Sequence, residues 1–211
     1  MKKSNLVSSR RQFLFNILPA GTMLCLGCSN LFALPISEDN QDVSTEKHKF
    51  LEDSGFTYKN VYEFAFRDWL IPHMKNLANE IGQEKFIKML KESSAKHASQ
   101  SGKQWAESVP QNDFATFVTS HRNAWTQNPF WMNVLSHEII KQSENEFEVK
   151  ITECLWAKTF REANASDIGY ASVCYGDYAN YTSYNPKLKL IRDKTLMQGE
   201  DFCHFRWIWE G

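Results

Sequence analysis

The stretch Glu146–Ile151, with the sequence EFEVKI, alternates strictly between charged and apolar residues. In an extended chain, Phe147, Val149 and Ile151 point to one side and the charged residues point to the other. This alternation predicts a strand of a half-buried antiparallel sheet, with one face on a core and the other in solvent.

The sequence on either side of this strand predicts two hairpins. The turn residues Ser143–Asn145 join it to a preceding strand predicted over Phe130–Lys141. A second pair of strands is predicted at Lys187–Leu196 and Phe202–Trp209, connected through the turn Gly199–Asp201. Both pairs are antiparallel because their connections are short.

Helical periodicity fills the rest of the chain. Apolar residues recur at three- and four-residue spacings over residues 59–82, where Pro72 predicts a kink. A second helix is predicted at Glu84–Lys96, and a third begins at an N-cap, either Asn112 or Asp113.

Two more helices are predicted between the hairpins, one over Glu153–Ala165 and one from Ser166 or Asp167 to about Tyr181. The predicted fold class is therefore α+β. It consists of N-terminal helices and then two β-hairpins forming an antiparallel sheet with two helices between them.

The first 33 residues differ from the rest of the chain. They hold four basic and no acidic side chains, and an apolar stretch, Phe13–Leu26, follows the basic start. This layout is typical of an export signal and too short for a membrane-spanning helix. Ser9–Leu14 fits the twin-arginine pattern, because Arg10 and Arg11 precede large apolar residues. An ordinary secretory signal with a chance arginine pair is the alternative.

Two cleavage points compete. Leu26–Ser29 resembles the end of a lipoprotein signal, cut before Cys28, whereas Leu31–Ala33 offers a cut after Ala33. We expect an exported, periplasmic protein that meets the twin-arginine export machinery. Membrane contact is expected only through the signal or a lipid anchor on Cys28.

The body of the chain is mildly acidic. The whole chain has a net charge of −1, and without residues 1–33 it has 20 basic and 25 acidic groups, a net charge of −5. This balance argues against nucleic acid as a partner. Residues 34–56 are polar and predict a linker, and residues 57–211 predict a single domain.

The body has three cysteines, Cys154, Cys174 and Cys203. Export favours a disulfide, but an odd number of cysteines leaves at least one free thiol. An equal alternative is that all three cysteines are small, buried apolar residues of the core. Cys154 is the best nucleophile candidate, because it lies near a predicted helix N-terminus, whose dipole favours the thiolate.

Several charged residues accompany these cysteines. Asp177 lies three positions after Cys174 and would share its helix face. Arg192 and Arg206 lie on the predicted C-terminal strands, so both guanidinium groups could reach one site and hold a small carboxylate. Ordinary ion pairing on the sheet surface is the alternative. No metal or other cofactor is predicted, since the body has no CxxC or HExxH spacing, although Cys, Asp and His could bind zinc.

An ordered set of motifs in the last third of the chain resembles the L-2-amino-thiazoline-4-carboxylic acid hydrolase family. The set comprises Cys154, Cys174–Tyr178, Tyr184–Leu188, Arg192–Leu196 and Gly199–Trp207. The resemblance implies Cys154, Cys174, Asp177 and Cys203 as catalytic candidates. It also implies Arg192, Arg206 and Asn185 as candidates for binding a substrate that bears a carboxylate.

The activity that the resemblance implies is hydrolysis of a carbon–nitrogen bond, other than a peptide bond, in a small cyclic amidine or thiazoline. Ring opening leads towards carbamoyl-cysteine. The alternative is an exported, non-catalytic small-molecule-binding protein on the same fold. The 15 Phe, 7 Trp and 7 Tyr could line its binding pocket. A third, weaker hypothesis gives the cysteines a purely structural role between sheet and helices.

Overall fold

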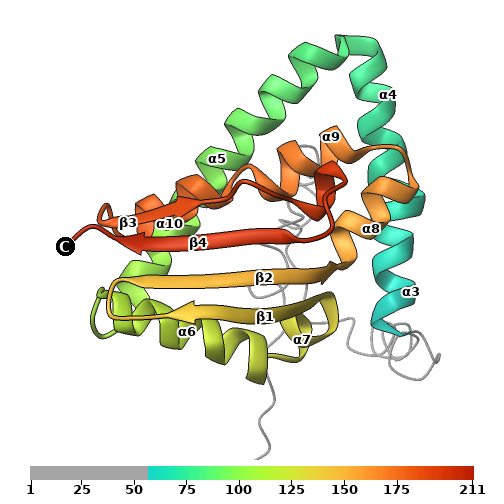
Figure 1. Cartoon of the computed structure of the whole chain (residues 1–211). Helices are drawn as coiled ribbons and strands as arrows, with labels where there is room; N and C mark the ends of the chain where they lie inside the picture. Colours follow the sequence, from blue (N-terminus) through green and yellow to red (C-terminus); the bar gives the residue numbers. More distant parts are fainter. Residues whose placement is uncertain (1–56) are drawn as a thin grey trace, which may run out of the picture. The chain divides into compact units, whose positions relative to one another are not determined.

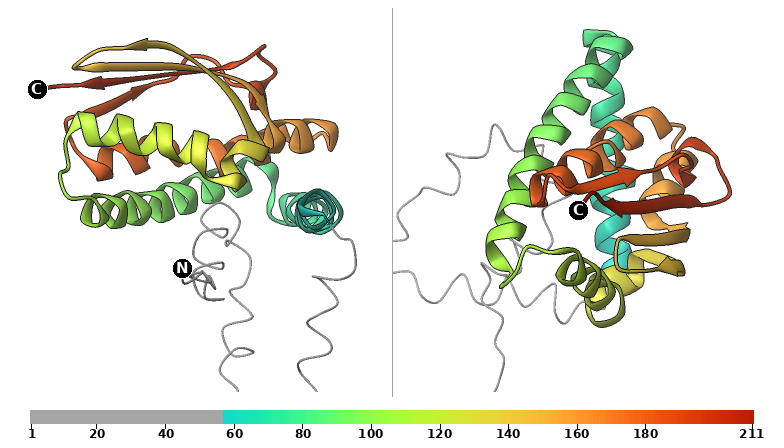
Figure 2. Two further views of the ribbon diagram at one scale, coloured as in Figure 1. Left: turned by 90° about the horizontal axis from the view of Figure 1, so that it is seen from below. Right: turned by 60° about the vertical axis from the view of Figure 1, so that its left-hand side comes forward.

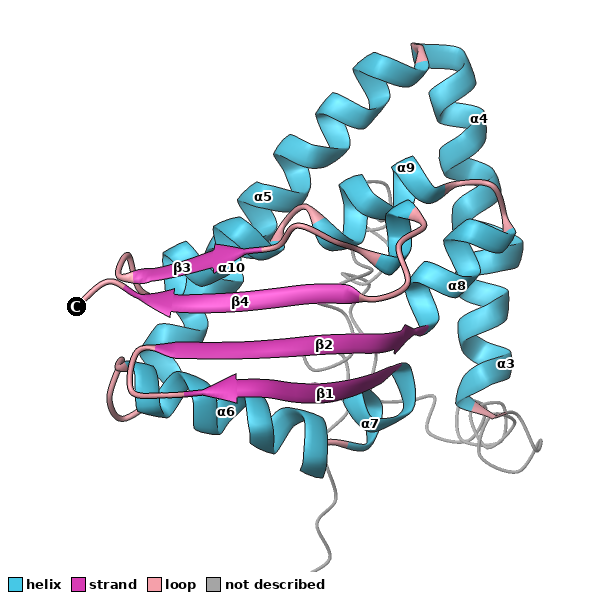
Figure 3. Cartoon of the chain, in the orientation of Figure 1, coloured by secondary structure: helices cyan, strands magenta, loops and turns pink. Residues whose placement is uncertain are grey.

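A four-stranded antiparallel sheet organises the computed structural model, which describes residues 57–211 (Figure 1). Its strands are β1 (Leu135–Gln142), β2 (Glu146–Cys154), β3 (Leu188–Ile191) and β4 (Cys203–Trp209). The spatial order is β1-β2-β4-β3, and all neighbours are antiparallel, as Figure 3 shows. The α+β prediction, with two antiparallel pairs and helices between them, is confirmed.

The chain divides after Tyr62. In the unit before this division, the structure describes the short helix α3 (Tyr58–Tyr62). The second unit begins with a π-helical segment, η2 (Glu63–Leu70), which leads into α4 (Ile71–Ile81). The predicted export signal, both cleavage points and the linker 34–56 lie outside the described residues.

The remaining elements complete the second unit. In chain order they are α5 (Gln83–Ser108), α6 (Phe114–Gln127), α7 (Pro129–Val134), α8 (Leu155–Glu162), α9 (Ser166–Gly169), π-helical η3 (Tyr170–Cys174), α10 (Asp177–Tyr184) and 3₁₀-helical η4 (Leu196–Gln198). No helix in the described part of the chain is both long and apolar enough to cross a membrane.

The helices of this unit cover one face of the sheet (Figure 2, left). Large side chains from the covered sheet face and from α6 and α10 form the core, and Trp207, Phe147, Phe117 and Tyr184 are almost fully buried. The other sheet face carries charged side chains, as the alternation in β2 predicts. We call the covered face the inner face and the charged face the outer face.

Helix α5 packs closely on α10, and glycine makes the approach possible. A Cβ on Gly102 would lie 2.1 Å from the backbone oxygen of Asn180, so any residue larger than glycine would clash there. A Cβ on Gly176 would likewise lie 2.9 Å from Ser94 and Ala98. These contacts fix the start of α10, where the candidate site begins.

Several predicted boundaries are wrong. The strand predicted over Lys187–Leu196 is shorter, because β3 ends at Ile191 and Leu196 belongs to η4. The helix predicted from Ser166 or Asp167 to about Tyr181 is divided into α9, η3 and α10.

Phe130–Val134 belongs to α7 rather than to a strand, because the Asn128 side chain caps the Phe130 backbone N–H and Pro129 occupies the first turn. Helix α5 continues twelve residues beyond the predicted end at Lys96, because its polar second half packs on α10. The predicted start of α6 is confirmed, with Asp113 as its N-cap.

Candidate active site

A β-bulge aims Cys154 at the inner face. The neighbouring residues Ser136 and His137 of β1 pair with Glu153 and Ile151 of β2, so one residue of β2, Thr152, has no partner of its own. An extra residue reverses the alternation beyond it. Cys154 therefore packs against the core instead of joining the charged outer face.

Cys154 is also the N-cap of helix α8, in agreement with its predicted place near a helix N-terminus. Its Sγ accepts a hydrogen bond from the Ala157 backbone N–H at 3.4 Å. Burial nevertheless raises the pKa of Cys154 to about 11, and the backbone hydrogen bonds of α8 offset only part of this rise. The helix end therefore does not produce a preformed thiolate at neutral pH.

Cys174 and Asp177 flank a break in the helical path. The π-helical segment η3 ends at Cys174, and α10 starts at Asp177 after Tyr175 and Gly176. The break leaves the Cys174 carbonyl without a helical partner, and it accepts a hydrogen bond of 2.9 Å from Nη2 of Arg192. Burial raises the pKa of the Cys174 thiol well above its usual value.

Arg192 ties this break to the sheet. It follows β3 on the inner face, its side chain is 1% exposed, and its Nη1 donates to Asp177 Oδ2 at 2.5 Å. The rings of Tyr170, Tyr178 and Phe205 surround its guanidinium carbon at 5.7, 5.0 and 5.2 Å. Nη1 and Nη2 of the buried guanidinium are therefore bound to Asp177 and to the protein backbone, whereas Nε is buried without a hydrogen-bond partner among the described residues.

Asp177 keeps access to solvent, since its side chain is 32% exposed. Burial raises the pKa of this carboxyl group, although Arg192 acts in the opposite direction. A carboxyl group that is oriented by a buried cation and still partly open is suited to meet a cationic ligand or to accept a proton.

Cys203 completes the cluster from β4. It is buried, and its Sγ accepts a hydrogen bond from the Leu196 backbone N–H at 3.2 Å. Asp177 acts to raise the pKa of all three thiols, and Cys203 also acts on the other two, which agrees with Cys154, Cys174 and Cys203 lying near one another. All three are free thiols, so the disulfide considered from the sequence is absent from the described residues.

We call Cys154, Cys174, Asp177, Arg192 and Cys203 the thiol–carboxylate cluster. The prediction that both arginines reach one site is wrong, because Arg206 lies on the outer face. There its Nε donates to Glu146 Oε1 at 2.5 Å, and its side chain is 40% exposed. Alternation along β4 separates it from the neighbouring inner residues.

Asn185 also lies away from the cluster. It ends α10, where its side chain donates to the Asn112 carbonyl at 2.9 Å and accepts from the Lys187 backbone N–H at 2.9 Å. These bonds give it a structural role at the start of β3.

Two neighbours of the cluster escaped the sequence analysis. Tyr181 lies one helical turn after Asp177, and Nε2 of His121 lies 3.3 Å from the Tyr181 hydroxyl oxygen. The four-residue spacing of Asp177 and Tyr181 was visible in the sequence, but the pairing of α6 with α10 was not. Among residues 57–211, no group of three or more His, Cys, Asp or Glu side chains is placed to hold a metal ion.

A separate hollow of about 370 Å³ lies between α6 and the β1–β2 turn. Its lining includes Phe114, Val118, Arg122 and Gln142, and Arg122 donates to Gln142 at 2.8 Å. It contains none of the candidate residues predicted from the sequence.

Comparison with known proteins gives one result for this domain. A family model described as L-2-amino-thiazoline-4-carboxylic acid hydrolase matches residues 62–207. No curated protein matches the chain. The matched range runs from before η2 into β4, and so includes the whole thiol–carboxylate cluster.

Proposed function

Because the chain belongs to the L-2-amino-thiazoline-4-carboxylic acid hydrolase family, we propose that it opens the ring of a small cyclic amidine that bears a carboxylate. Water adds to the amidine carbon between the ring sulfur and nitrogen, and one ring bond to that carbon breaks. Cleavage of the carbon–nitrogen bond leaves the carbamoyl group on sulfur, whereas cleavage of the carbon–sulfur bond leaves it on nitrogen and releases a thiol.

One observation carries this proposal. Arg192, buried and ringed by aromatic side chains, holds Asp177 beside three free thiols, and Asp177 remains partly exposed. A carboxylate is the natural partner of an amidinium group, since two N–H donors can meet its two oxygens. We therefore assign Asp177 to the amidine and Arg192 to positioning Asp177, in place of the carboxylate clamp expected from the sequence.

The attacking group is a thiol or a water molecule. Cys154 is the stronger thiol candidate, since backbone N–H groups of α8 face its sulfur and would stabilise negative charge there. Its raised pKa of about 11 means that it must lose its proton during the attack. Asp177, whose pKa is also raised, is suited to accept that proton, or the proton of an attacking water.

The test is incubation of the purified protein with 2-amino-thiazoline-4-carboxylate, with the product identified by mass spectrometry and thiol release followed by colour reaction. Thiol release would indicate carbon–sulfur cleavage, and the same mass without a new thiol would indicate carbon–nitrogen cleavage. We expect Cys154→Ala to lower turnover at least about a hundredfold if the thiol attacks. Undiminished turnover in both Cys154→Ala and Cys174→Ala would leave water as the nucleophile.

The second candidate function is non-catalytic binding of a small molecule. It is favoured by the raised pKa of all three thiols, which keeps them neutral. Saturable binding of the amidine without any ring opening over hours would support this candidate and overturn the hydrolase.

We also propose that the protein is exported by the twin-arginine route and is either periplasmic or anchored by lipid on Cys28. The arginine pair and the Gly27-Cys28 sequence support this proposal. Mass spectrometry of the mature N-terminus tests it. A lipidated Cys28 or an N-terminus at residue 34 would support export, and an intact N-terminus in the cell would contradict it.

A further inference from the structure

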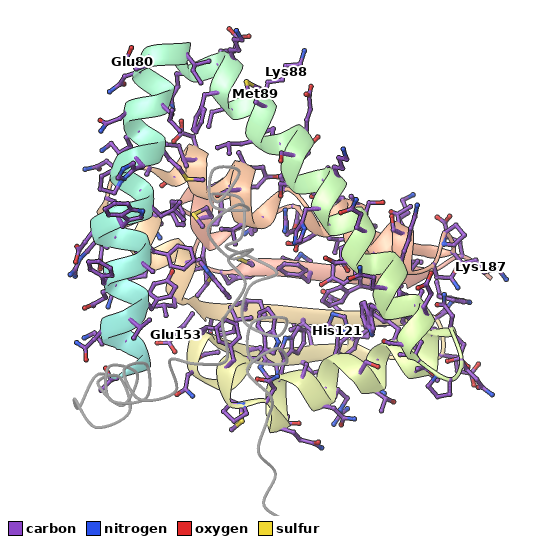
Figure 4. All side chains as sticks on the ribbon, turned by 180° about the vertical axis from the view of Figure 1, so that it is seen from behind. Glu80, Lys88, Met89, His121, Glu153 and Lys187 are labelled. Atoms are coloured by element: carbon purple, nitrogen blue, oxygen red, sulfur yellow. The ribbon has the colours of Figure 1, made fainter. Side chains whose placement is uncertain are left out.

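His121 is enclosed by aromatic rings next to the thiol–carboxylate cluster. It lies on the inward side of α6 and is 8% exposed, and Figure 4 labels it among the side chains packed between this helix and the strands. Five ring centroids lie 4.4 to 5.6 Å from its own. They belong to Trp105, Phe117, Trp125, Tyr181 and Trp207. Burial lowers the pKa of His121 to about 4, so the ring is neutral at physiological pH.

The contacts of the neutral ring determine its tautomer. Nδ1 lies 3.3 Å from the Phe117 carbonyl oxygen, which can only accept a hydrogen bond, so Nδ1 carries the proton. Nε2 is then an acceptor, and the Tyr181 hydroxyl, 3.3 Å away, donates to it. His121 thereby directs the only hydrogen of the Tyr181 hydroxyl away from any ligand.

Tyr181 reaches the cluster from the same helix as Asp177. The two residues are four apart on α10 and so lie on one face. Burial raises the pKa of the Tyr181 hydroxyl, and Asp177 and Arg192 act on it in opposite directions, in agreement with this shared face. Its oxygen has lone pairs left after its hydrogen is bound to His121, so it can accept from a donor placed beside Asp177.

We propose that Tyr181, oriented by His121, is a second acceptor for the amino group of the amidine and so distinguishes 2-amino-thiazolines from ring analogues without that amino group. This inference rests on the proposed function. The Asp177 carboxylate meets the amidine edge formed by the ring N–H and one N–H of the amino group, and Tyr181 accepts the remaining N–H of that amino group. His121 is a positioning residue, since it acts through Tyr181.

The first test reads the hydroxyl direction without a substrate. In the full-length protein with ¹⁵N-labelled histidine, NMR should show His121 protonated on Nδ1, with an Nε2 shift that marks an accepted hydrogen bond. Tyr181→Phe should move the Nε2 resonance and leave the Nδ1 proton in place. Tyr184→Phe is the matched control, because this buried hydroxyl on the same helix has no partner among the described residues. A proton on Nε2 in the unmodified protein would overturn the proposal.

The second test reads selectivity. Initial rates give kcat/KM for 2-amino-thiazoline-4-carboxylate, and the same assay gives the inhibition constant of the 2-methyl analogue. Tyr181→Phe should lower kcat/KM roughly five- to tenfold, as expected for one hydrogen bond, and change the inhibition constant less than about twofold. Tyr184→Phe should change neither.

Equal losses for both ligands in Tyr181→Phe, or no loss for either, would overturn the selectivity role. If the unmodified protein neither turns over the 2-amino compound nor binds it, the proposed function fails and the ligand contact fails with it. The NMR result would still decide the hydroxyl direction, so the two failures are distinguishable.

Discussion

The two faces of the sheet each carry an arginine–carboxylate pair with the same 2.5 Å separation, yet the pairs have different surroundings. On the inner face, Arg192 is 1% exposed and bound to Asp177; on the outer face, Arg206 is 40% exposed and bound to Glu146. The pKa of Asp177 is raised, mainly by burial, whereas that of Glu146 is lowered by its hydrogen bonds from Lys141 and Arg206. Burial of the arginine, and not pairing geometry, distinguishes the inner pair, since the Glu146 side chain is itself only 14% exposed whereas Asp177 is 32% exposed.

The histidines repeat the contrast. Burial lowers the pKa of His121 on the inner side to about 4. Burial also acts to lower the pKa of His204 on the outer face, but hydrogen bonds to Glu148 and Asp193, at 2.7 and 2.8 Å, outweigh it and raise the pKa. The pKa shifts of the carboxyl groups and of the histidines therefore have opposite signs on the two faces.

The largest effect is expected from breaking the inner pair. Asp177→Ala leaves the Arg192 charge buried without a charge of opposite sign and should lower the free energy of unfolding by about 3 kcal/mol. Glu146→Ala, the matched change on the outer face, leaves Arg206 in water and should produce no comparable loss. Denaturant unfolding of both variants measures the difference, and equal losses would show that the faces do not differ in this way.

A comparable effect is expected from acid. The folded-state pKa of His121, about 4, lies below the unfolded value of about 6.5, so the unfolded chain binds more protons between these values. Stability from this residue is complete above pH 6.5 and falls by up to ~3 kcal/mol as the pH is lowered through 4. The pH dependence of unfolding should therefore be shallower over this window in His121→Gln. Parallel curves for the two proteins would refute the buried neutral histidine.

The fold was largely predictable from local patterns. The alternation of Phe147, Val149 and Ile151 located β2, and Asp113 located the start of α6, because each signal needs only a few neighbouring residues. Helix α5 was underestimated, because the surface that stabilises its polar half is α10, about 80 residues further along the chain.

The candidate site was predictable only as a set of residues. The motifs identified Cys154, Cys174, Asp177, Arg192 and Cys203, and the structure brings them together. Arg206 was wrongly grouped with Arg192, since β3 and β4 pair with Ile191 opposite Arg206, which puts the two arginines on opposite faces. The bulge that turns Cys154 inward depends on pairing with β1, which no local pattern in β2 indicates.

A smaller effect of opposite sign is expected at His204. Its folded-state pKa is raised, so its stabilisation is fully present below about pH 6.5 and is lost as the pH rises through the folded value. His204→Gln should lower stability at pH 5.5 by less than about 1 kcal/mol and leave it unchanged at pH 9. Thermal unfolding at the two pH values checks this, and a larger loss at pH 9 would reverse the assignment.

The smallest effect is expected from exchanging the outer cation. Arg206→Lys keeps a positive charge beside Glu146 at a position where the cation is 40% exposed, so neither the unfolding midpoint nor its dependence on salt should change measurably. Arg192→Lys is the matched inner change. It should lower the midpoint, because lysine cannot bond both Asp177 and the Cys174 carbonyl in the same planar arrangement.

The most direct measurement compares two single variants, Asp177→Asn and Glu146→Gln, by their initial rates of 2-amino-thiazoline-4-carboxylate ring opening. Both substitutions remove one carboxylate charge from an arginine pair and preserve side-chain shape. If Asp177 acts on the amidine, Asp177→Asn loses at least about a hundredfold in kcat/KM, and Glu146→Gln keeps the unmodified rate. Full activity in Asp177→Asn, or equal losses in the two variants, would contradict the assignment of the inner face as the active site.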